Sequence, residues 1–224
     1  NTGTTAATGD YIYYLDSDDE FTEDCIEKLM AVALNDHEIE IVQGNGRMEY
    51  WNHGFTKLRN LVARNPYTKQ FPKNHVTSNE EVRACYYQKK LIPGTAWNKL
   101  IKRSFLTDHH LLFKEGIIYE DHLWFFFTLK YLRTVSFVSD ITYVYKRRPG
   151  SITTGADKKT VTRHRCIIYK AIITHLTPGH EMEEYQYYGR FYATFYRRYA
   201  YCMPAFRETF PLYWQQAWQN ACVP

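Results

Sequence analysis

The sequence predicts an α/β chain, in which short buried strands are interspersed with amphipathic helices. Of the 224 residues, 45% are hydrophobic and 23% are charged, which are the proportions of a globular protein. The run YIYYL at residues 11–15 has the composition of a buried strand, and the segment after residue 22 has helical spacing. No stretch approaches the ~18 uninterrupted apolar residues of a membrane-spanning helix. The composition also excludes intrinsic disorder, collagen and coiled coil.

The first strand leads directly into an acidic run and then into a helix. We expect Thr22 to cap that helix, because Thr is a good N-cap. Glu23 and Asp24 then stand in the first turn, where negative charge interacts favourably with the helix dipole. The apolar face of the helix is predicted to consist of Ile26, Leu29, Met30 and Ala33.

The rest of the chain continues the mixed pattern of strands and helices and ends in a segment with helical periodicity. It predicts, in chain order, strands at 39–42 and 47–51, a long polar loop or insert at 52–80, an apolar and basic alternation at 97–106, a helix at 121–132, and a strand, turn and strand at 135–144. A helical tail follows residue 150. Its predicted aromatic stripe comprises Tyr185, Tyr188, Tyr192, Phe195 and Tyr199, and Pro204 and Pro211 interrupt the helical pattern beyond the stripe.

Charge and cysteine content limit the environment of the protein. The net charge is +4 at pH 7, and the excess of Lys and Arg lies after residue 145. A basic tail behind an acidic front suggests contact with phosphates, a membrane surface or the acidic half itself, or else a solvated basic face. No pair among Cys25, Cys85, Cys166, Cys202 and Cys222 has zinc-ligand or C-x-x-C spacing. We therefore expect reduced thiols in a cytoplasmic protein.

The acidic run after the first strand is the strongest chemical signal. Asp16 and Asp18 stand two residues apart at a strand end, so their side chains point to the same side. Such close carboxylates need a counter-charge, and a hard divalent cation, Mg²⁺ or Mn²⁺, is the natural candidate. The alternative is that these aspartates only cap a turn or a helix.

Four segments of the sequence occur in the same order as similar motifs in a known enzyme family. Residues 1–19 contain N-x-G-x-x-x-A-x-G-D-Y-I followed by L-D-S-D-D. Later come WNKL at 97–100, YED at 119–121 before a bulky run at 123–127, and YKRRPGSIT at 145–153. Together they resemble family 2 glycosyltransferases of the GT-A fold, in which N-x-G-x-x-x-A-x-G-x-Y leads into the strand that ends with the metal-binding D-x-D motif.

The resemblance implies a fold and an activity. The fold is a GT-A, Rossmann-like α/β domain with a mixed sheet, flanking helices and a helical C-terminal tail. The activity is transfer of a sugar from a nucleotide diphosphate sugar, most simply a UDP-sugar, to an acceptor hydroxyl with inversion. The acceptor would be a saccharide or a lipid-linked saccharide, as in the synthesis of bacterial surface polysaccharide or glycolipid.

The resemblance also implies residue roles. Asp18 matches the metal ligand, Asp16 the position near the ribose and metal, and Asp121 the catalytic base. Asp19, Lys99 and Arg147 are assigned to the donor phosphates, and Glu120 and Trp97 to the acceptor side. The alternatives are that Glu120 and Asp121 only start a helix, that Lys99 and Arg147 are surface charges, and that Trp97 belongs to the core.

The sequence differs from the family pattern in one large respect, and this difference determines the domain division that we expect. In the family, the first strands and most of the nucleotide-base pocket come before the segment that matches Asn1. We therefore expect the chain to begin inside a longer protein. Residues 1–153 would be the C-terminal part of the catalytic domain, and residues 154–224 a helical, Tyr-rich basic tail. Without earlier strands, the strand at 11–15 would have an open edge, which favours a homo-oligomer.

Three other interpretations remain open from the sequence. An aspartyl-phosphate phosphohydrolase would use Asp16 as nucleophile, but it requires Thr or Val at Glu20 and a late G-D-x-x-x-D segment. A truncated, non-catalytic binding module would explain why the family's first strands are missing from this sequence. The basic clusters Arg163–Arg165 and Arg197–Arg198 suit the inner face of a membrane, whereas nucleic-acid binding is not expected because the Tyr stripe is helical.

Overall fold

The computed structural model describes residues 1–50, 68–148, 150–151 and 155–189. They divide into two compact units. The first unit is Asn1–Phe113 with Trp124–Gly155, and the second is Lys114–Leu123 with the chain from Ala156 onward. The predicted domain boundary near residue 153 therefore lies close to the division, but the second unit also takes in a short segment from the middle of the chain.

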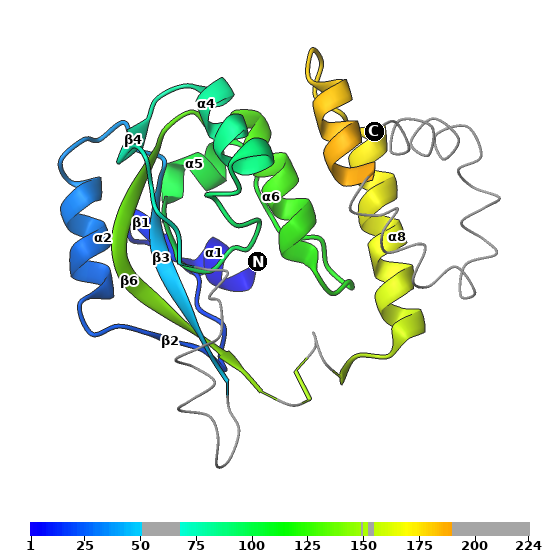
Figure 1. Cartoon of the computed structure of the whole chain (residues 1–224), viewed down its shortest axis with the longest axis horizontal. Coiled ribbons are helices and arrows are strands. Elements are labelled where there is room, and N and C mark those ends of the chain that lie inside the picture. The colour runs from blue at the N-terminus through cyan, green and yellow to red at the C-terminus, as the bar shows by residue number, and fades with distance from the viewer. Residues whose placement is uncertain (51–67, 149, 152–154, 190–224) are drawn as a thin grey trace. The chain divides into compact units, whose positions relative to one another are not determined.

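The first unit is built on one mixed sheet (Figure 1). Its strands lie in the order β1 (Tyr11–Tyr13), β5 (Lys99–Lys102), β3 (Ile41–Tyr50), β6 (Val135–Arg147) and β2 (Glu20–Phe21), and β4 (His75–Val76) also pairs with β6. The central β3–β6 pair is parallel, and every other pair is antiparallel. Within the described residues β1 pairs with β5 alone, and association through its other edge stays a prediction.

Two long strands replace several shorter elements that the sequence predicted. The strands expected at 39–42 and 47–51 are one strand, β3, and the strand, turn and strand expected at 135–144 are one strand, β6. The register between them shifts after Gln43 and again after Asn45, and β6 contains the extra residues. A bulge thus accommodates the polar residues Ser139 and Asp140, which the pattern had placed in a turn.

A glycine is required where the bulge meets the neighbouring strand. A Cβ at Gly44 would lie 2.5 Å from Oδ1 of Asn98 and closer still to Oγ1 of Thr142. Asn98 adopts a φ of +59°, and its carbonyl accepts a hydrogen bond from the Gly44 amide at 3.2 Å. The W-N-K-L segment therefore packs closely against both β3 and β6 at the start of β5.

Helix α2 (Cys25–Ala33) packs on one face of the sheet. Helix α5 (Arg103–Asp108) and the part of α6 (Glu120–Tyr131) from Trp124 lie on the other face (Figure 1). The helix begins one position after Asp24, so the prediction that Thr22 is its cap was wrong. Its fully buried side chains are Cys25, Leu29 and Ala33, at intervals of four. Ile26, assigned to the apolar face, is 42% exposed, because the true face is centred on Leu29.

The remaining helices of the first unit are short, apart from α6. They are α1 (Thr2–Ala6), α4 (Asn79–Arg83), which continues into a π-helical turn (Ala84–Gln88), α5 (Arg103–Asp108) and α6 (Glu120–Tyr131), whose first residues belong to the second unit. The helix predicted at 121–132 is thus confirmed as α6. The predicted loop at 52–80 is only partly described, and its described end holds β4 and the start of α4.

Within its described residues, the second unit has two helical segments after residue 156. Helix α8 (Lys158–Thr174) is capped by Asp157, whose Oδ2 accepts a hydrogen bond from the Thr160 amide at 2.9 Å. Residues 181–189 are also helical. Tyr185 and Tyr188 of the predicted stripe are buried, and its other three members lie outside the described residues. No helix among the described residues is both long and apolar enough to cross a bilayer.

Candidate active site

Three carboxylates gather in the turn that follows β1. Asp16, Asp18 and Asp19 each place an oxygen within 4.8 Å of the other two. The turn is closed by a hydrogen bond of 3.1 Å from the Asp19 amide to the Asp16 carbonyl. Asp16 is exposed, Asp18 half-buried and Asp19 buried. The structure thus brings together the three aspartates that the sequence predicted.

Asp19 is the member that fixes the turn to the sheet. Its Oδ2 accepts a hydrogen bond from the Tyr143 hydroxyl, and its Oδ1 accepts one from the Lys146 amide, both at 2.7 Å. Burial raises the pKa of Asp19, while these two donors act in the opposite direction. Because both oxygens are engaged by β6, Asp19 positions the turn, and its assignment to the donor phosphates stays a prediction.

Tyr143 connects the turn to the aromatic interior. Its hydroxyl also accepts a 3.4 Å hydrogen bond from the Asp16 amide, and its ring stacks on Trp97 with centroids 4.5 Å apart. Trp97 is only 6% exposed. In the structure the Trp97 ring supports Tyr143, and its assignment to the acceptor side stays a prediction.

Arg148, which the sequence did not single out, is the basic residue at the cluster. Its Nε and Nη2 both lie 3.0 Å from Oδ2 of Asp18. The predicted residue, Arg147, is exposed and lies over the ring of Tyr50 at 5.7 Å, and its assignment to the donor phosphates stays a prediction. Consecutive residues of an extended chain point to opposite sides, so only one of the two arginines can meet the turn.

Lys99 does not reach the cluster either. It is fully buried, and its Nζ donates to the carbonyls of Pro93 and Thr95 at 2.9 and 2.6 Å. Burying an ammonium requires such partners. Lys99 therefore fastens the loop before β5, and its assignment to the donor phosphates is corrected.

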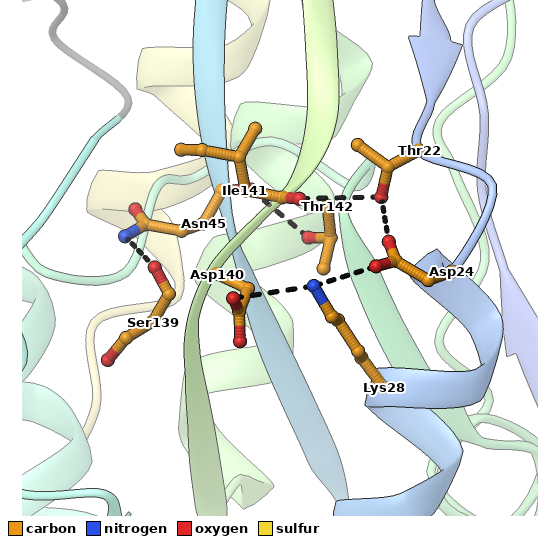
Figure 2. Close-up of polar contacts among 8 residues, drawn as sticks. All are labelled: Thr22, Asp24, Lys28, Asn45, Ser139, Asp140, Ile141 and Thr142. Carbon is orange, nitrogen blue, oxygen red and sulfur yellow. Dashed lines mark hydrogen bonds and ion pairs between the residues drawn. The ribbon is translucent and has the colours of Figure 1, made fainter.

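A second polar group fastens the chain just after the turn (Figure 2). Lys28 Nζ lies 2.8 Å from Asp24 and 3.3 Å from Asp140 in the β6 bulge. The Thr22 hydroxyl donates to Asp24 Oδ1 at 2.8 Å, and the Thr22 amide donates to the Thr142 carbonyl at 3.1 Å. The start of α2 is thereby tied to β6, so β6 holds the acidic turn at Asp19 and again at this point.

The candidate base belongs to the second unit. Glu120 and Asp121 form the first turn of α6, directly after Tyr119, whose φ is +64°. Oδ1 of Asp121 accepts a hydrogen bond of 2.9 Å from the His122 amide. Burial and the charge of Arg165 lower the pKa of His122 to about 4, so its ring is neutral at neutral pH.

The donor set of the acidic turn fits a hard divalent cation. All its side-chain ligands are carboxylate oxygens, which Mg²⁺ and Mn²⁺ prefer, and such ions need only one or two of them. Asp16 and Asp18 are the members that solvent reaches, whereas Asp19 is committed to β6.

A mixed α/β sheet with helices on both faces and an acidic turn after a buried strand defines the GT-A class of fold. The Staphylococcus aureus TarS 1–349 structure in complex with UDP-GlcNAc is similar over 99% of this chain and 58% of that one, with a TM-score of 0.58 and 18% identity. Its complex with UDP gives a TM-score of 0.55 at 17% identity.

The sequence comparisons show what the chain is similar to. Residues 1–104 match the model of Glycosyl transferase family 2. EpsH of Bacillus subtilis (strain 168), a protein named as a glycosyltransferase, is 29% identical over 83% of this chain and 51% of its own length. The cholesterol galactosyltransferase of Borreliella burgdorferi is 26% identical over 67% of this chain and 41% of its own. The chain spans about half the length of these relatives or less.

Proposed function

We propose that the protein transfers a sugar from a nucleotide diphosphate sugar to an acceptor hydroxyl, with inversion at the anomeric carbon. The observation that carries the proposal is the acidic turn, in which Asp16 and Asp18 are presented at the end of β1 while Asp19 is held by Tyr143 and Lys146. A carboxylate pair of this kind suits a divalent cation, which in turn can bind the diphosphate end of the donor. The UDP-GlcNAc bound by TarS favours a UDP-sugar here.

Asp16 and Asp18 would hold a Mn²⁺ or Mg²⁺ ion, whose positive charge stabilises the departing nucleoside diphosphate. Arg148 pairs with Asp18 in the structure and keeps the carboxylates from repelling one another. When a cation takes that carboxylate, the Arg148 guanidinium becomes available to the diphosphate, to which its planar fork is suited.

Asp121 would act as the general base. Its carboxylate takes the proton of the acceptor hydroxyl while the hydroxyl oxygen bonds to the anomeric carbon. The bond from that carbon to the diphosphate oxygen breaks on the opposite face. One carboxylate is sufficient for this direct displacement. Glu120 beside it remains the candidate for binding the acceptor.

The setting of the reaction is also part of the proposal. We propose a saccharide or lipid-linked saccharide acceptor in polysaccharide or glycolipid synthesis, a cytoplasmic location with contact at the inner membrane face, and a homo-oligomer. The basic residues of the tail support the membrane contact, because anionic headgroups attract them.

The test is a donor screen on the full-length protein with Mn²⁺, measuring release of nucleoside diphosphate with and without acceptor. Chelation of the metal should abolish release, and re-addition should restore it. Absence of turnover with every UDP-, GDP- and CDP-sugar would favour the alternative of a non-catalytic binding module.

A further inference from the structure

The segment that leads into α6 is held by consecutive residues of α8. The backbone amide of Ile118 donates to Nδ1 of His164 at 2.9 Å. The guanidinium carbon of Arg165 lies 4.6 Å from the centre of the Tyr119 ring, within the range of a cation–π interaction. These four residues belong to the second unit, so both contacts lie within one compact body.

The held segment has an unfavourable backbone conformation. Tyr119 has a φ of +64°, in the left-handed region, which is unfavourable for a non-glycine residue. Such a conformation persists only where surrounding contacts impose it. The Tyr119 carbonyl accepts from the His122 amide at 3.2 Å, and the two rings meet edge to face at 6.0 Å. The two contacts from α8 thus act together with these local contacts to hold the turn.

The direction of the next two side chains depends on that turn. Glu120 and Asp121 follow Tyr119 immediately, and the His122 amide that bonds to the Tyr119 carbonyl also donates to Oδ1 of Asp121 at 2.9 Å. If Tyr119 relaxed to an ordinary φ, the first turn of α6 would unwind and the Asp121 carboxylate would move. A carboxylate that is misplaced by about 1 Å can lose up to about 100-fold in rate.

We propose that His164 and Arg165 are positioning residues that fix the carboxylate of Asp121 through the Ile118–Tyr119 turn. The inference rests on the proposed function, which makes Asp121 the base. It gives α8 a part in the reaction, and it changes the interpretation of the basic cluster at 163–165. Only Arg163 of that cluster is exposed, whereas its two neighbours are half-buried and face the turn.

The test compares variants of the full-length protein by hydrogen exchange and by kinetics. Arg165→Ala and His164→Ala should speed amide exchange across residues 116–122 by about tenfold or more, because the local structure opens more often. The same variants should lower kcat by ~10- to 100-fold, since only the transition state needs the aligned carboxylate. The KM for the donor should stay within about twofold for the same reason.

Conservative variants and a control on the same helix separate positioning from general damage. Arg165→Lys keeps the charge, and His164→Asn provides an amide oxygen as acceptor, so both should recover part of the loss. Arg163→Ala should leave exchange and kcat unchanged. If Arg165→Ala does not fold, as judged by circular dichroism, the His164→Ala and His164→Asn pair decides.

Unchanged exchange at 116–122 in a folded Arg165→Ala or His164→Ala variant would overturn the inference. So would a loss of kcat that Arg163→Ala reproduces. Because exchange is measured without substrate, it tests the hold of α8 even if the wild-type protein transfers no sugar. In that case the proposed function fails, and the exchange data alone decide whether α8 fixes the Ile118–Tyr119 turn.

Discussion

The hydroxyl of Tyr143 donates a hydrogen bond of 2.7 Å to Oδ2 of Asp19, which lies 124 positions earlier in the chain. This bond, with the Lys146 amide on the other oxygen, joins the acidic turn to the longest strand of the sheet. A turn of adjacent carboxylates would otherwise separate by repulsion. The geometry of the candidate metal site therefore depends on β6 as much as on the turn itself.

Tyr143→Phe should loosen the turn. The change removes a donor that lowers the pKa of Asp19, so that pKa should rise further. A buried carboxylate that loses a partner typically costs ~1–3 kcal/mol in the free energy of unfolding. Urea unfolding near pH 7 measures the loss. Tyr145→Phe, two positions along the same strand, is the matched control, and an equal loss in both variants would argue against a specific Tyr143–Asp19 bond.

The pH dependence of stability should carry the signature of Asp19. Burial raises the pKa of Asp19 above its usual value of 3.8. Its contribution to the free energy of unfolding is therefore greatest below that value and is lost as the pH rises through the folded-state pKa. Asp19→Asn does not titrate, so the stability of the wild type minus that of the variant should fall across this interval. Urea unfolding between pH 3 and 7 gives the difference; a rise with pH would contradict the assignment.

Arg148→Ala should strengthen binding of Mn²⁺ to the apoprotein. The guanidinium pairs with Asp18 and competes with a cation for the same oxygen. Both side chains are partly exposed, and such pairs contribute at most about 1 kcal/mol, so the gain should be no more than about fivefold. Isothermal titration calorimetry measures it. Asp18→Ala is the contrasting variant and should abolish binding; weaker Mn²⁺ binding in Arg148→Ala would show that the arginine does not compete.

Asp121→Asn should lower kcat by ~10²- to 10⁴-fold, which is the usual contribution of a positioned general base. Donor affinity should hardly change, because proton abstraction belongs to the transition state. The measurement is steady-state kinetics with a saturating donor, beside direct titration of donor binding. A collapse of donor binding instead would make Asp121 a binding residue or a helix cap.

Gly44→Ala should destabilise the first unit strongly. The new methyl group would overlap the side chains of Asn98 and Thr142 inside the sheet. Overpacking of this kind costs ~1–3 kcal/mol or more. Thermal and urea unfolding report the loss. Gly3→Ala is the control, since nothing lies within 4 Å of a Cβ there and Ala is favoured in its helix. A Gly44→Ala variant as stable as the wild type would show that β6 can shift to accept the methyl group.

The site was predictable as far as its chemistry is local. The three aspartates follow a short apolar strand, and strand periodicity places two of them on one side. The structure gathers all three within 4.8 Å. The basic partner was not predictable, because Arg147 and Arg148 are equivalent in the sequence. Only the course of β6 decides that Arg148 reaches Asp18 while Arg147 lies over Tyr50.

The sequence by itself determined the local elements of this protein: the strand before the acidic turn, the helix predicted at 121–132 and the mixture of strands and helices. Periodicity and residue type are properties of neighbours in the chain. Tertiary structure alone decided the burial and the contacts of residues to which the sequence assigned a role. The sequence does not show that Lys99 and Trp97 are buried. In the structure Lys99 donates hydrogen bonds to two backbone carbonyls, and the Trp97 ring stacks on Tyr143. It also decided that 135–147 is one strand, because its parallel partner β3 pairs on both sides of a bulge. Partners so distant in the chain leave no periodic signal.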